Sequence, residues 1–171
     1  MTEKIKQEKT LFMTRLMTPD MSNFSGKVHG GTILKLLDEA AFTCASRYCK
    51  TYVVTKSLDQ VVFKKPIAVG DLMTFKCNIN YVGKTSMEVG IRVEGERIKE
   101  KKEYHAISSY FTMVSVDDNG KPMEAPRLDL DSEVEKKLFE AGKMRCSMRK
   151  EIQERNNQLH VSLENWINIW K

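Results

Sequence analysis

An aspartate lies inside a largely apolar helical segment that follows a pair of glycines. Apolar residues recur with helical spacing from Thr32 to about Cys49, and Asp38 interrupts them. On a helical wheel, Asp38 shares one stripe with small and apolar residues, namely Gly31, Leu34, Ala41, Phe42 and Ala45. Burial raises the pKa of an unpaired carboxyl group and so prepares it as a general base or acid near neutral pH. Asp38 is therefore the first catalytic candidate, against the alternative of a solvated carboxylate paired with Lys35 one turn earlier.

The glycine pair Gly30 and Gly31 stands immediately before Thr32, where this helix is expected to begin. Backbone N–H groups at a helix N-terminus can polarise a carbonyl group, and donors aimed at its developing negative charge lower a barrier by roughly 3–4 kcal/mol. Asp38 follows Gly31 by seven residues, which is roughly 10 Å of helix. Because this distance is too long for both groups to serve one carbonyl, we expect them to meet from different chains of a dimer.

These groups must be positioned by the helix and by five expected strands. Five runs rich in β-branched and aromatic residues are bounded by turn signals, at residues 10–16, 52–63, 71–81, 85–93 and 104–116. Most connections between the later runs are short, which favours antiparallel pairing, whereas residues 95–103 form a longer charged hairpin tip. Residues 22–31 contain three glycines and an asparagine and are typical of a loop with exposed backbone. The chain is predicted to be α+β, with an antiparallel five-stranded sheet curled around a central helix.

A second amphipathic helix is expected in residues 132–156. Its apolar positions at helical spacing are Val134, Leu138, Ala141, Met144, Met148 and Ile152. We expect this helix to dock on the outer sheet or on a neighbouring subunit rather than on a membrane surface. Residues 157–171 support no clear prediction.

The composition is that of a globular protein with one core, since 41% of the residues are hydrophobic and 30% are charged. No apolar run is long enough to span a membrane. Residues 1–6 lack the apolar stretch of a signal peptide, so a cytoplasmic location is expected. The net charge of +5 is spread along the chain, which suits a small anionic ligand better than nucleic acid.

The cysteines show no spacing that is typical of a metal site, and no metal is expected. We interpret all four as reduced thiols: Cys44, Cys49, Cys77 and Cys146. Cys44 stands between alanines in the predicted helix and is expected to be a small core residue rather than a nucleophile.

The segment from Asn23 to Ala41, NFSGKVHGGTILKLLDEAA, closely resembles the signature of acyl-CoA hydrolases of the hotdog superfamily. It is most similar to the bacterial YciA and mammalian brain-type group. The resemblance continues through 53–55, 63–67, 69–71 and 82–86, and covers roughly residues 10–128. It implies a single hotdog domain at residues 8–128, followed by a C-terminal helical extension at 132–171.

The resemblance also implies an activity, hydrolysis of fatty acyl-CoA to free fatty acid and coenzyme A without a cofactor. In such enzymes the aspartate matching Asp38 acts as general base or nucleophile. The asparagine matching Asn23 comes from the partner subunit and positions the thioester or the attacking water. With the Gly31 amide polarising the carbonyl, the resemblance implies a homodimer with composite sites, assembled as a trimer of dimers.

Coenzyme A is expected to lie along the subunit boundary. By their match to the family pattern and their chemistry, the candidate residues that bind it are His29, Gly30, Val54, Thr55, Lys64, Lys65, Gly83, Lys84, Thr85 and Ser86. His29 is expected to shape the loop or pack on the substrate rather than act as a base. For the segment 82–86, an ordinary hairpin turn is an equally good interpretation.

Two other functions occur on hotdog domains, a non-catalytic acyl-CoA sensor and a dehydratase. Asn23 and Asp38 argue against the sensor, and the dehydratase requires a histidine placed as an acid–base partner. Within thioester hydrolysis, direct attack by Asp38 to give a mixed anhydride is the alternative to activation of water.

Overall fold

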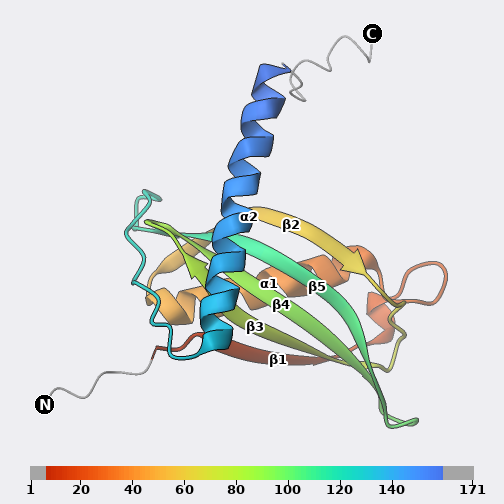
Figure 1. Ribbon diagram of the computed structural model, residues 1–171. Helices are drawn as coiled ribbons and strands as arrows, with labels where there is room; N and C mark the ends of the chain where they lie inside the picture. Colours follow the sequence, from red (N-terminus) through yellow and green to blue (C-terminus); the bar gives the residue numbers. More distant parts are fainter. Residues whose placement is uncertain (1–6, 160–171) are drawn as a thin grey trace, which may run out of the picture. The chain divides into compact units, whose positions relative to one another are not determined.

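The structure is a computed structural model that describes residues 7–159. A single antiparallel sheet forms the larger part of it, with strand order β1-β3-β4-β5-β2. The strands are β1 (Thr10–Leu16), β2 (Tyr52–Phe63), β3 (Leu72–Val82), β4 (Ser86–Arg97) and β5 (Lys102–Val116) (Figure 1). The predictions for residues 1–6 and 160–171 lie outside the described residues.

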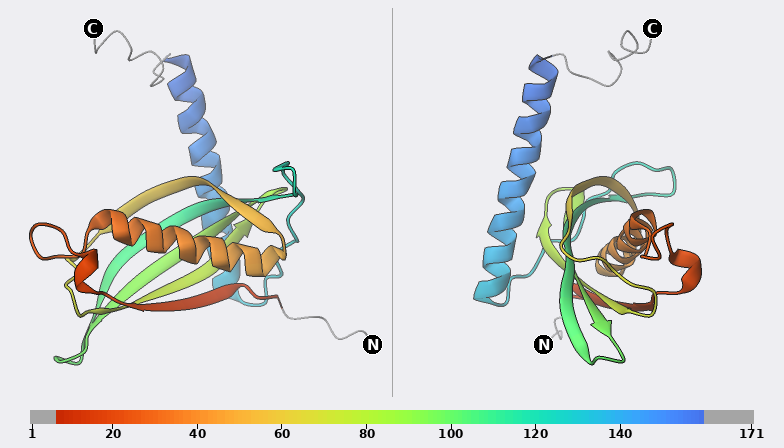
Figure 2. Two further views of the ribbon diagram at one scale, coloured as in Figure 1. Left: turned by 180° about the vertical axis from the view of Figure 1, so that it is seen from behind. Right: turned by 90° about the vertical axis from the view of Figure 1, so that its right-hand side faces the viewer.

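The central helix α1 (Gly30–Cys49) lies along the concave side of this curved sheet (Figure 2). The predicted α+β fold, a five-stranded antiparallel sheet wrapped around a helix, is therefore confirmed. A short 3-10 helix η1 (Pro19–Met21) and a loop connect β1 to α1. One face of α1 is buried against the sheet, through Ile33, Leu36, Leu37, Ala40, Ala41, Cys44, Ala45, Tyr48 and Cys49.

The helix begins at Gly30, two residues before the predicted start. The side chain of His29 caps it by accepting a hydrogen bond from the Gly31 amide, so both glycines enter the first turn. Lys50 ends the helix in a left-handed conformation with φ of 58°.

Strand β4 extends to Arg97 and β5 begins at Lys102, so the expected hairpin tip at residues 95–103 is shorter than predicted. Backbone pairing continues through charged residues because it does not require apolar side chains on the outer face of a sheet. Glu94 forms ion pairs with Lys76 on β3 and with Arg92 on its own strand, so paired charges occupy this face.

The core lies between α1 and the inner face of the sheet. Alternate residues of β4 point into it, and Met87, Val89 and Val93 are fully buried. Burial raises the pKa of the Cys44 thiol and of the Cys77 thiol to about 12, so neither forms a nucleophilic thiolate at neutral pH. All four cysteines are free, as predicted.

The chain divides into two compact units between Asp129 and Leu130. The second unit contains α2 (Glu133–Gln158), which confirms the predicted helix. A capping box begins it, because the Ser132 hydroxyl accepts from the Glu135 amide while the Glu135 carboxylate accepts from the Ser132 amide. No helix within residues 7–159 is long and apolar enough to cross a membrane.

Replacement of Leu37 by alanine should lower the free energy of unfolding by about 2–5 kcal/mol, because it leaves a cavity beneath a fully buried helix position. Chemical denaturation followed by circular dichroism measures this change. Lys35→Ala, on the exposed face of the same helix, is the control and should stay within about 0.5 kcal/mol of wild type. Equal effects of the two substitutions would contradict the assigned helix orientation.

Candidate active site

Asp38 lies on the side of α1 that faces β2. Its carboxylate oxygen Oδ1 accepts a hydrogen bond of 2.6 Å from the Thr55 hydroxyl of β2. Lys35 pairs with Glu39 at 3.8 Å, so the alternative of an Asp38–Lys35 ion pair is wrong. The expectation that Asp38 is buried is also wrong for the single chain, in which it is exposed. The sheet covers only the face of the helix that carries Leu37 and Ala41, and Asp38 lies beside that face.

The surroundings of Asp38 are nevertheless apolar. Leu34 and Phe42 lie one helical turn before and after it, and the Leu34 side chain is 37% exposed. The neighbouring strand β2 adds exposed Leu58, which lies on the same face of the sheet as Thr55, whereas Val54 points to the opposite face. Among residues 7–159, β2 pairs only with β5, so its other edge is open. An open strand edge beside exposed apolar side chains is typical of a protein–protein interface.

Asn23 holds the loop before α1 in shape through its side-chain oxygen. Its Oδ1 accepts from the Ser25 amide at 2.9 Å, the Ser25 hydroxyl at 2.7 Å and the Lys27 amide at 3.1 Å. The loop turns at Gly26, which has a positive φ of 71°. Because Oδ1 is fully used, the Nδ2 amide group is what Asn23 can offer to a ligand, and it is a donor only.

A cavity of about 390 Å³ opens beside this loop. It brings together four residues predicted from the sequence: Asn23, Gly30, Lys64 and Lys65. Sequence reasoning did not assign its other lining residues, Ser25, Lys27, Val28, Ile33, Phe63, Pro66 and Ile67. The run 63–67 was part of the family resemblance, and this was the available signal for Phe63 and Pro66. The volume is within the range of small-molecule sites.

The Gly31 amide is not a free donor. It donates to Nδ1 of His29 at 2.9 Å, which makes the imidazole a helix cap and matches the expectation that His29 shapes this loop. The Gly31 amide can therefore reach a carbonyl only when the imidazole turns away. Gly30 lines the cavity directly and is the glycine of the pair that lies next to a ligand there.

Within a single chain, the other predicted residues do not line this cavity. Asp38, Val54 and Thr55 are not among the residues that line it. The turn 83–85 connects β3 to β4. Its Thr85 carbonyl accepts from the Ser115 amide near the end of β5, and its Lys84 carbonyl accepts from the Ala125 amide. Lys64 and Lys65 instead follow the end of β2, near the start of β3, at the opposite end of the sheet. Within one chain, the 83–86 turn and the cavity beside Asn23 therefore lie toward opposite ends of the sheet.

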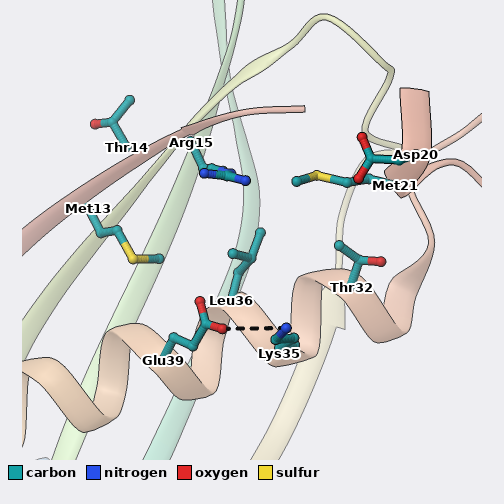
Figure 3. Close-up of a pocket in the computed structure, with 9 residues that line it drawn as sticks. All are labelled: Met13, Thr14, Arg15, Asp20, Met21, Thr32, Lys35, Leu36 and Glu39. Carbon is teal, nitrogen blue, oxygen red and sulfur yellow. Dashed lines mark ion pairs between the residues drawn. The ribbon is translucent and has the colours of Figure 1, made fainter. Parts of the chain in front are cut away.

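A second cavity, of about 490 Å³, lies between β1, η1 and α1 (Figure 3). It is lined by Met13, Thr14, Arg15, Asp20, Met21, Thr32, Lys35, Leu36 and Glu39, and the Lys35–Glu39 ion pair lies along the helix side of it. None of the predicted site residues lines this cavity. No cluster of three or more His, Cys, Asp or Glu side chains within residues 7–159 is arranged to hold a metal ion.

Comparisons with known proteins identify the family to which this chain belongs. Residues 25–101 match the family model described as Thioesterase superfamily. The protein VdlD of Helicobacter pylori is 48% identical over 139 residues, covering 81% of this chain and 79% of VdlD. An apo-hexameric acyl-CoA thioesterase of known structure is 35% identical with a TM-score of 0.80, covering 84% of this chain and 92% of that one.

The acyl-CoA hydrolase of Staphylococcus aureus, solved with butyryl coenzyme A and coenzyme A, is 32% identical with a TM-score of 0.80. The match covers 89% of this chain and 93% of that chain. The same enzyme has also been solved as three variants, in which an asparagine, an aspartate or a threonine is replaced by alanine. On the identity and coverage of these matches, the chain belongs to the hotdog thioesterase superfamily, in its family of acyl-CoA thioester hydrolases.

Proposed function

We propose that this protein hydrolyses fatty acyl-CoA, with Asp38 and Asn23 as its catalytic residues. The observation that carries the proposal is the Asp38 carboxylate, held by Thr55 on an exposed apolar helix face. The three residues replaced in the S. aureus variants are of the same types, and at the same intervals along the chain, as Asn23, Asp38 and Thr55. This correspondence supports a shared site.

The active site is composite. Asp38 and the cavity around Asn23 occupy different regions of one chain, so the Asp38 of one subunit meets the Asn23 cavity of its partner. The open edge of β2 and the apolar side chains beside Asp38 form the contact between the two subunits. The hexameric neighbour supports assembly of three such dimers.

In the proposed reaction the thioester carbonyl oxygen accepts a hydrogen bond from Asn23 Nδ2 and lies near the N-terminus of α1. The Thr55 hydroxyl occupies Oδ1 of Asp38, which leaves Oδ2 to take a proton from water. The water oxygen adds to the carbonyl carbon. The resulting oxyanion is stabilised by the Asn23 Nδ2 group and by the N-terminus of α1. Collapse of this intermediate breaks the C–S bond, and the departing sulfur takes the proton from Asp38.

Direct attack by Asp38 is the alternative chemical route. It would form a mixed anhydride, and single turnover in labelled water would place solvent oxygen in the enzyme carboxylate. Lys64 and Lys65 are the phosphate-binding candidates at the Asn23 cavity, and the 83–86 turn would have to come from another subunit.

Asp38→Asn should lower kcat for butyryl-CoA by about 100-fold or more, because the amide cannot accept the proton from water. Thr55→Ala should cause a smaller loss of about tenfold, because it removes one hydrogen bond that orients the carboxylate. The matched control is Glu39→Gln, since Glu39 is the adjacent carboxylate and pairs with Lys35 instead. Thiol release measured at equal oligomer size tests this, and a full rate in Asp38→Asn would refute the assigned role.

Asn23→Asp separates the two functions of Asn23. A carboxylate oxygen can still accept from the Ser25 and Lys27 amides, so the loop is kept, but the Nδ2 donors are lost. We expect Asn23→Asp and Asn23→Ala to lose about 100-fold or more in kcat alike. If Asn23→Asp kept most of the wild-type rate, Asn23 would shape the loop and not contact the substrate.

Co-expression of the Asn23→Ala and Asp38→Asn chains tests whether the sites are composite. Random pairing should restore about a quarter of wild-type activity, because half of the dimers are mixed and each mixed dimer contains one intact site. Differential affinity tags isolate the mixed dimers for direct assay. Sites built within one chain would instead leave every mixed dimer inactive.

A further inference from the structure

We propose that a basic hollow next to the Asn23 cavity binds the phosphate groups at the nucleotide end of coenzyme A. We call this hollow the hairpin pocket, and it is lined by Lys27, Ala68, Val69, Gly70, Asp71, Arg97, Ile98, Lys99 and Glu100. The inference rests on the proposed function and adds a phosphate subsite to it.

The hairpin pocket adjoins the Asn23 cavity, and Lys27 lines both. Residues 27 and 28 form a short antiparallel contact with residues 67 and 68, through the Lys27–Ala68 bridge and the bond from the Val28 amide to the Ile67 carbonyl. Residues 63–67, which precede Ala68, line the Asn23 cavity, and residues 68–71 line the hairpin pocket. An extended ligand can therefore pass from one hollow to the other across Lys27.

The charges around the hairpin pocket favour a polyanion. Its cations are Lys27, Arg97 and Lys99. Within residues 7–159, neither the Lys27 nor the Lys99 ammonium forms an ion pair, so both are available to a ligand. Coenzyme A carries a diphosphate and a separate ribose phosphate, together about four negative charges. Lysine and arginine side chains bind such oxygens through charge-assisted hydrogen bonds.

The two acidic side chains that line the pocket both have partners within the fold. Glu100 pairs with Arg97 at 3.4 Å. Asp71 is only 5% exposed, and its Oδ2 accepts from the Tyr104 hydroxyl at 2.5 Å and from the Ala68 amide at 3.0 Å. The repulsion that a free carboxylate would exert on phosphate is therefore weakened, and the cations dominate.

Tyr104 links the cations of the two hollows. The Lys65 ammonium and the Arg97 guanidinium each lie 5.9 Å from the centre of its ring. The ring fits only because Gly95 has no side chain, since a Cβ there would overlap Tyr104 Cζ. Lys65 lines the Asn23 cavity and Arg97 lines the hairpin pocket, so one buried ring holds a cation of each hollow.

The test compares butyryl-CoA with butyryl-pantetheine, which has the same thioester but no nucleotide. In a double variant Arg97→Ala, Lys99→Ala, the preference in kcat/KM for butyryl-CoA over butyryl-pantetheine should fall about tenfold or more, through KM. The kcat values and the rate on butyryl-pantetheine should not change. Lys121→Ala removes a positive charge at the opposite end of the sheet and should leave the preference at its wild-type value.

Titration calorimetry with adenosine 3′,5′-bisphosphate gives a second readout that needs no turnover. Its affinity should fall in the double variant and not in Lys121→Ala. An unchanged preference and unchanged affinity in the double variant would overturn the proposal, and a loss in Lys84→Ala alone would assign the phosphates to the 83–86 turn instead. If the wild type released no thiol from butyryl-CoA while binding the bisphosphate through Arg97 and Lys99, the proposed function would fail and the phosphate site would stand.

Discussion

The burial of one face of α1 in the curved sheet is the constraint on which the rest of the structure depends. The sheet covers the side of the helix that carries Leu37 and Ala41, and the adjoining side with Asp38 stays open beside β2. A carboxylate in such a place is hydrated in a single chain and loses water only when another surface covers it. Subunit contact would therefore both complete the proposed site and place Asp38 in apolar surroundings.

The end of the molecule near the helix N-terminus is organised differently, around polar groups that are mostly satisfied within the fold. Asn23 uses its oxygen on the loop, His29 caps the Gly31 amide, and Asp71 accepts from Tyr104. What remains for a ligand are donors and cations, chiefly the Asn23 amide group and the lysines around it. A carbonyl oxygen and phosphate groups are the ligands that such a surface suits, and a thioester of coenzyme A has both.

The secondary structure followed from local pattern, because the period of apolar residues distinguishes a buried helix from strands regardless of what packs on them. The errors were at ends of elements. Helix α1 begins two residues before the predicted start because the His29 side chain supplies a cap, which the residue pattern did not predict. Strand β4 continues to Arg97 because strand pairing tolerates charged side chains on an open face. One cavity brings together Asn23, Gly30, Lys64 and Lys65, which the family resemblance had named, and their shared role in a site stays a prediction.

By itself the sequence determined the α+β fold, the helix that carries Asp38 and the loop that carries Asn23, since these depend on residue type and spacing along the chain. The tertiary structure alone decided that Thr55 binds Asp38, that His29 occupies the Gly31 amide, and that Lys27, Arg97 and Lys99 surround one hollow. These contacts join segments far apart in sequence or depend on a side-chain rotamer. Strand register and helix orientation set such contacts, and both are fixed only when the whole core is packed.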